Sequence, residues 1–241
     1  MKRTRPRNGN ARSRPRRTGS LLLGMTALGL GIAMAALGAL SQPPEPREEL
    51  AQLLLTQEEL IEVLEDTGWV IKTVDRLNPE PEGGVSAVAT YANPNRFLSL
   101  VIGLIRFETP ELLDTFVAAI LEAPQLQAPP RDLRAEAEET PELLPEPILQ
   151  ETQRAILLYL ERDQQQVLLQ RNELLLFVRL AQQPQGTLTT EERTDQLLRV
   201  GARQLQKVLD FCAERTAQVD AGELPSDAVP AYCVPLEEET P

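Results

Sequence analysis

The sequence predicts an α+β domain that follows an N-terminal export or membrane-anchoring segment. Three observations lead to this prediction. The chain begins with a basic stretch followed by an apolar run. Short apolar runs bounded by Gly, Pro and Asn then indicate strands. Two longer amphipathic stretches open with helix-capping residues. An antiparallel or mixed sheet packed by two main helices is the simplest arrangement that buries all these apolar faces.

The N-terminal segment has two parts. Residues 1–20 carry eight basic side chains and no acidic one, and residues 21–40 form an uncharged run of 20 residues. A basic flank before an apolar stretch is typical of a signal peptide or a signal anchor. Because positive charge stays on the cytoplasmic side, residues 1–20 are expected to be a cytoplasmic leader and the rest to be extracytoplasmic.

Whether residues 21–41 are cleaved or retained stays open. Their length favours a retained membrane helix, which needs about 20 apolar residues. Their many Gly and Ala residues, and the small residues around Ser41, favour a cleavable signal peptide. The Arg16–Arg17 pair also allows the twin-arginine route. We therefore expect a single-pass membrane protein anchored by residues 21–40, or a secreted or periplasmic protein if cleavage occurs near Ser41. This style of leader indicates a bacterial source.

The body of the chain begins with a Pro-rich spacer and a short helical stretch over residues 42–55, and an α+β domain is predicted over residues 56–215. Thr56 and Glu59 match a capping box, which opens a helix. Thr109 and Pro110 open the first main helix. The strands predicted between these helices are Trp69–Val74, Val85–Tyr91 and Phe97–Phe107.

Residues 122–147 form an expected linker inside this domain. The segment holds six prolines and an acidic run at Glu136, Glu138 and Glu139. Such a composition buries little apolar surface, so an irregular or mobile loop is predicted.

The second half of the domain repeats the order of the first. Strands are predicted at Ala155–Leu160, Val167–Gln170 and Leu174–Leu180, and Thr189 with Glu192 opens a second main helix. The repetition leads to the hypothesis of a duplicated strand-strand-helix unit. The alternative is the general logic of α+β folds. Residues 216–241 are predicted to be a C-terminal tail.

The charge and composition of the body disfavour several functions. Removing the leader leaves 16 basic and 36 acidic residues, a formal charge of −20, which disfavours nucleic-acid binding. The chain has no histidine, so Ser-His-Asp catalysis, Cys-His catalysis and histidine metal sites are excluded. We predict no cofactor, no metal site and no catalytic residue. Whether the chain is an enzyme stays open, and a non-enzyme is favoured.

Cys212 and Cys233 are the only cysteines in the chain. Outside the cytoplasm such a pair usually oxidises, so a structural disulfide is predicted. A redox role is the alternative, although the spacing is not C-x-x-C.

Three residues are candidates for contact with a ligand or partner. Arg106 and Arg179 lie within apolar strands, where a charge must face water, pair with an acid or meet a ligand. If the halves are duplicates, these two arginines are equivalent. Trp69 could line a pocket, although a large aromatic beside a strand usually serves the core.

These observations predict an extracytoplasmic protein for binding, assembly or sensing, with a protein partner and an unidentified small-molecule ligand as open alternatives. A carboxylate-only exported hydrolase is the competing enzyme class, and a thiol-disulfide protein is a third. Two buried carboxyl groups facing each other in a cleft would support the hydrolase.

Overall fold

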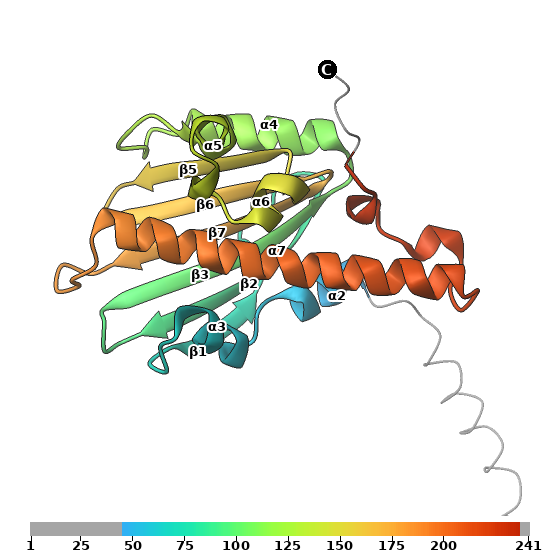
Figure 1. The fold of residues 1–241 in the computed structure, drawn as a ribbon, viewed down its shortest axis with the longest axis horizontal. Helices are drawn as coiled ribbons and strands as arrows, with labels where there is room; N and C mark the ends of the chain where they lie inside the picture. The colour runs from blue at the N-terminus through green and yellow to red at the C-terminus, as the bar shows by residue number, and fades with distance from the viewer. Residues whose placement is uncertain (1–44, 237–241) are drawn as a thin grey trace, which may run out of the picture. The chain divides into compact units, whose positions relative to one another are not determined.

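A computed structural model describes residues 45–236 of the chain, which form the fold drawn in Figure 1. The apolar run at residues 21–40 lies outside the described residues. Within residues 45–236, no helix combines the length and the apolar character that a membrane crossing requires. The helices are α2 (Pro46–Leu53), α3 (Gln57–Leu64), α4 (Pro110–Leu121), α5 (Leu133–Glu139), α6 (Glu146–Glu151) and α7 (Thr190–Asp220), with 3-10 turns η1 (Pro141–Leu143), η2 (Ser226–Ala228) and η3 (Ala231–Cys233).

Seven strands form one antiparallel sheet, which confirms the α+β prediction and selects the antiparallel alternative over the mixed one. The strands are β1 (Val70–Asp75), β2 (Gly84–Asn93), β3 (Leu98–Phe107), β4 (Arg131–Asp132), β5 (Arg154–Leu160), β6 (Gln164–Arg171) and β7 (Leu174–Gln182). Their order in the sheet is β1-β2-β3-β7-β6-β5-β4, and every neighbouring pair is antiparallel. The central β3–β7 pair therefore joins the two halves of the chain.

Helices cover both faces of this sheet, which explains why the central strands are almost continuously apolar. On one face, here called the α7 face, Leu197, Val200 and Leu205 of α7 join a cluster with Leu100, Ile102 and Leu176 of the sheet and with α2, α3, α5 and α6. On the other face, the α4 face, Leu113 and Val117 pack against Ile105, Leu175 and Phe177. Successive residues of a strand point to opposite faces, so both clusters draw on the same strands.

The predicted helix starts are confirmed. The hydroxyls of Thr56 and Thr189 each accept a hydrogen bond from the third helical N–H. The carboxylates of Glu59 and Glu192 in turn accept the backbone N–H of the cap residue. Thr109 caps α4 through the N–H of Leu112. The last helix is longer than predicted and continues beyond Cys212 to Asp220.

The segment over residues 122–147 differs from the irregular linker that its composition predicts. It contains β4, α5 and η1 and leads into α6. Asp132 caps α5, and Leu133, Ala137, Leu144 and Ile148 are buried in the cluster of the α7 face. Three buried apolar residues within the segment, together with Ile148 just after it, therefore attach it to the core despite its six prolines.

The two halves share the order strand, strand, helix, but they do not place the helix alike. The sheet order β2-β3-β7-β6 is symmetric about its centre. A two-fold axis through that centre would put both helices on one face, whereas α4 and α7 lie on opposite faces. The duplication hypothesis thus gains no support from a symmetric arrangement.

Candidate functional site

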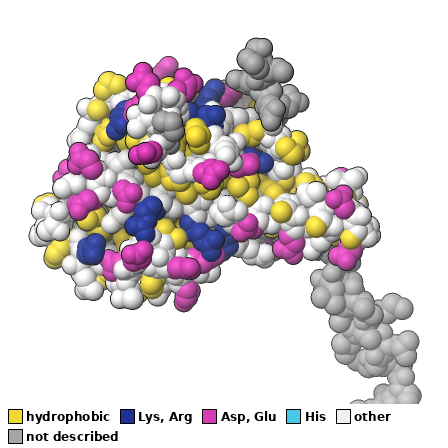
Figure 2. Space-filling view, viewed as in Figure 1, with side chains coloured by type: hydrophobic (Ala, Val, Ile, Leu, Met, Phe, Trp, Pro, Cys, Tyr) yellow, Lys and Arg dark blue, Asp and Glu magenta, His cyan; other side chains and the backbone are white. Residues whose placement is uncertain are grey.

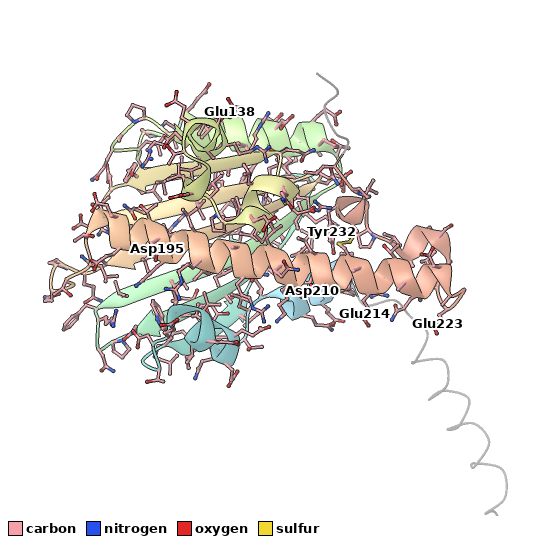
Figure 3. All side chains as sticks on the ribbon, in the orientation of Figure 1. Glu138, Asp195, Asp210, Glu214, Glu223 and Tyr232 are labelled. Carbon is pink, nitrogen blue, oxygen red and sulfur yellow. A yellow bond between two sulfur atoms is a disulfide. The ribbon has the colours of Figure 1, made fainter. Side chains whose placement is uncertain are left out.

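The carboxylates do not converge on a cleft. None of the Asp and Glu side chains among residues 45–236 is buried, whereas the buried polar residues include Gln165, Gln204 and Arg171. Figure 3 shows Asp195, Asp210 and Glu214 spread along α7, with Glu138 apart on α5. Among the described residues, no group of acidic or Cys side chains could hold a metal ion. The paired buried carboxyl groups that a carboxylate hydrolase needs are thus missing from this part of the chain.

The carboxyl pKa shifts point the same way. A general acid needs a raised pKa, but the resolved shifts all lower it. The N–H and hydroxyl of Ser86 and the charge of Arg47 lower the pKa of Glu80. Partial burial would raise the pKa of Glu59, but hydrogen bonds from Lys207 and Thr56 outweigh it. These carboxylates therefore act as ion-pair and capping partners.

The predicted disulfide between Cys212 and Cys233 is confirmed. It connects α7 to the C-terminal segment, defined here as residues 229–236, with the two Cα atoms 5.1 Å apart. Both cysteines are buried, which counts against a redox role. Figure 3 shows the disulfide beside Tyr232 along α7.

Arg171 attaches this C-terminal segment to the sheet. Its side chain is only 5% exposed and forms an ion pair with Glu151 at 2.5 Å. The guanidinium also donates to the carbonyl oxygens of Tyr232 and Val234, at 3.1 and 3.4 Å. The neighbouring Asn172 donates to Val234 as well. A buried arginine with so many protein partners is structural.

Tyr232 links the C-terminal segment to α2. The hydroxyl donates to Glu49 Oε1 at 2.9 Å, and Arg215 Nη2 lies 3.7 Å from Glu49 Oε2. Burial, followed by the charge of Glu49, raises the pKa of Tyr232 far above its usual range, so the hydroxyl remains a donor. The C-terminal segment thus contacts α2 through Tyr232.

A polar contact attaches α2 and α3 to α7. The amide of the fully buried Gln204 donates to Leu53 O at 2.7 Å and accepts from the N–H of Leu55 at 3.0 Å. Lys207 donates to Leu54 O and to Glu59. Figure 2 shows basic and acidic side chains close together beside α7. Lys207 and Arg203 pair with Glu59, and Arg199 pairs with Glu65, so these cations are paired within the domain.

The three candidate contact residues lie in different environments. Trp69 is 1% exposed and belongs to the core of the α7 face. Arg106 is half-buried and lies on the same side of β3 as Leu104, which is the α7 face. Arg179 lies on the same side of β7 as Phe177, which is the α4 face. The two arginines therefore share no site, contrary to the equivalence that a duplication predicts.

Arg179 forms no ion pair within residues 45–236. Its Nε donates to Gln166 Oε1 at 2.7 Å, and desolvation lowers its pKa. The register places Arg179 opposite Val101, with Gln166 on its other side. The neutral amide of Gln166 thus accepts one hydrogen bond from the half-buried guanidinium of Arg179.

Exposed apolar side chains concentrate at one edge of the sheet. Of the five large hydrophobic residues that are exposed among residues 45–236, four are Val70, Ile71, Val74 and Phe97. The first three lie on the edge strand β1. Phe97 lies in the turn between β2 and β3, at the end of the sheet where β1 starts, because Val70 pairs with Ala92 near the end of β2. We call these four residues the β1 corner. Clustered apolar exposure usually marks a contact surface.

The β1 corner borders an open groove of about 450 Å³. Ala51, Leu54 and Gln57 of the α2–α3 region form one wall, and Ile71 and Val74 form the other. A second groove, of about 660 Å³, lies between α7 and the C-terminal segment and includes the structural Arg171. Only the first groove adjoins the clustered apolar side chains.

Phe97 has a backbone φ of 57°. This left-handed conformation is uncommon for a bulky residue, and it holds the ring at 41% exposure. Sequence reasoning did not single out the β1 corner, since Val and Ile in a predicted strand look like core residues. The signal that could have found it is Lys72, a charge inside a short apolar strand, which is typical of an edge.

Comparisons with known proteins give little further information. No protein-family model and no curated protein sequence matches this chain. Among solved structures, the chain is similar to the extracellular domain of PknH from Mycobacterium tuberculosis, with a TM-score of 0.38 and 11% sequence identity. The match covers 70% of this chain and 98% of that domain. The similarity is confined to the coarse architecture.

Proposed function

We propose that this chain is an extracytoplasmic binding domain, held at a membrane by residues 21–40, which contacts another macromolecule through the β1 corner. The basic leader and the uncharged run of 20 residues support the location. The disulfide is consistent with it, because such bridges persist in oxidising compartments.

The observation that carries the proposal is the clustering of exposed apolar side chains. Four of the five exposed large hydrophobic residues among residues 45–236 lie at one corner of the sheet. Two of them, Ile71 and Val74, point to the same face and line the groove. Isolated apolar residues on a surface need no explanation, but apolar side chains that line a groove together usually mark a contact surface. Binding explains this group, and the scattered carboxylates favour binding over hydrolysis.

The chain offers a matched control. Val74 is 52% exposed in the β1 corner, and Val234 is 54% exposed in the C-terminal segment. A photo-crosslinking amino acid at Val74, in the full-length protein in its native membranes, is expected to form adducts. The same amino acid at Val234 is expected to form few.

Equal crosslinking at the two positions, or none at Val74, would refute the proposal. The mass of the mature N-terminus, measured on the same sample, tests the anchor separately. A chain that begins near Gln42 would show that residues 21–41 are removed. That result would refute the anchoring by residues 21–40 and would not affect the proposed binding surface.

A further inference from the structure

We infer that Arg179 binds the carboxylate of a small ligand on the part of the α4 face that lies beyond α4. The site is in the middle of the sheet and not at the β1 corner, so the inference is independent of the proposed function. It has three supports, which are a half-buried patch of sheet, free donors at its centre, and a cation that no acid within residues 45–236 pairs with.

The central strands extend beyond α4 on the α4 face. The buried cluster of this face includes Leu175 and Phe177 of β7, and along that strand it ends at Phe177. The positions that follow on the same face are only half-buried. By register they form two adjacent rows, with Thr90, Val101 and Arg179 in one row and Ala92, Ser99 and Ala181 in the other. We call these six residues the open patch, in which small side chains surround one arginine.

Arg179 presents free donors in the open patch. Its Nε donates to Gln166 Oε1 at 2.7 Å, which is the one hydrogen bond of this side chain within residues 45–236. Its two Nη groups are not among the buried atoms that lack a partner, so they reach solvent. Gln166 is 4% exposed and fixes the guanidinium from one side. A guanidinium held in this way can bind a carboxylate through two parallel hydrogen bonds from its Nη groups.

The charge of Arg179 is not compensated within the described part of the chain. Its neighbours across β3 and β6 are the neutral Val101 and Gln166. Desolvation lowers the pKa of Arg179, and no carboxylate contributes an opposing shift. Arg154 on the same face differs, because its Nη1 lies 3.0 Å from Asp114 Oδ1. A half-buried cation without an acid costs stability, and the carboxylate of a ligand would supply the missing partner.

The charge of the open patch favours a monoanion. Its single arginine offers one positive charge, whereas the chain without its leader has a formal charge of −20, which repels phosphates and other polyanions. Val101 and Ala181 add apolar surface beside the guanidinium, and Thr90 and Ser99 add hydroxyls. A small carboxylic acid with a flat apolar body matches these groups, so benzoate is a suitable probe.

The test is a titration of benzoate against the full-length chain in non-ionic detergent micelles, followed by saturation-transfer NMR with protein-free micelles as the blank. Benzoate is expected to bind, and the neutral benzamide is not. R179M should raise the dissociation constant at least about tenfold, because charge-assisted hydrogen bonds are lost. R154M is the matched control and should leave it unchanged. Absent benzoate binding, equal binding of benzamide or inorganic phosphate, or equal effects of the two variants overturns the inference.

A second variant keeps the guanidinium and occupies its free donors. V101E places a carboxylate directly opposite Arg179 in the register, so it should abolish benzoate binding, whereas the neutral V101Q should retain it. R179M should leave the denaturation midpoint unchanged or higher, since Arg179 has no acidic partner within residues 45–236. A marked fall in that midpoint, or equal losses in V101E and V101Q, would overturn the inference. Crosslinking at Val74 should be unchanged in R179M, so a failure here leaves the proposed function standing.

Discussion

The C-terminal segment and strand β1 differ in a way that their secondary structure does not suggest. Residues 229–236 contain only a 3-10 turn, yet Tyr232 and Cys233 are buried. β1 is a six-residue strand paired with β2, with one register shift between Ile71 and Thr73, yet all of its residues are exposed. The first is held by a disulfide and by Arg171, whereas the second has a partner strand on one side only. Regular hydrogen bonding therefore does not decide which region is structural and which is available for contact.

The largest effect is expected at Arg171. R171M leaves Glu151 without its cation and removes the donor to the carbonyl oxygens of Tyr232 and Glu151, whereas Val234 O keeps Asn172 as a donor. Two acceptors left without a donor cost about 1–3 kcal/mol each, so with the lost ion pair the free energy of unfolding from chemical denaturation should fall by about 3–5 kcal/mol. R154M is the control, because the Arg154–Asp114 pair is exposed and worth about 0–1 kcal/mol. Similar losses in the two variants would show that the C-terminal segment is no better held than the surface.

The disulfide should have the next largest effect. Replacing both cysteines with serine opens a loop with a sequence separation of 21, which should cost about 3 kcal/mol. Thermal unfolding with and without a reductant measures the loss in the native protein. Hydrogen exchange should become faster in residues 229–236 and also in α2, because Tyr232 contacts Glu49. An unchanged melting temperature after complete reduction would contradict the structural role.

An intermediate effect, dependent on pH, is expected at Glu59 of α3, which pairs with Lys207 of α7. Its folded pKa lies below the unfolded value, so its stabilisation is present above the unfolded pKa and is lost as the pH falls through the folded pKa. Gln can still accept the N–H of Thr56 in the capping box, so E59Q should cost about 1–2 kcal/mol at neutral pH through the lost charge beside Lys207. Denaturation at pH 7 and under acidic conditions should show this difference shrinking with acid. A constant difference would exclude the charge as its cause.

The smallest effect on stability is expected in β1. Val74 is half exposed, so V74E should change the free energy of unfolding by no more than about 0.5 kcal/mol. In the same variant, a photo-crosslinking amino acid placed at Ile71, which lines the same groove, should form few adducts. A large loss of stability would show that Val74 serves the core, which would remove the contrast between β1 and the C-terminal segment.

Local sequence patterns were sufficient for much of the fold. The capping boxes at Thr56 and Thr189 predicted two helix starts because their hydrogen bonds span three residues. Alternation and apolar runs predicted the main strands, because these patterns are also properties of a few consecutive residues. The linker at 122–147 shows the limit. Its six prolines and acidic run predicted an irregular loop, although Leu133 and Leu144 within it pack into the core.

The sequence by itself determined that this is an acidic α+β body behind a basic and apolar segment, with two cysteines suited to a disulfide. Charge, composition and local periodicity are properties of the chain, so they need no tertiary structure. Only the tertiary structure decided that Arg171 holds Tyr232, 61 residues away, and that β1 lies at an edge. Strand order and long-range pairing set which apolar residues remain exposed. Lys72 indicates an edge strand, but it does not specify that Val74 remains exposed.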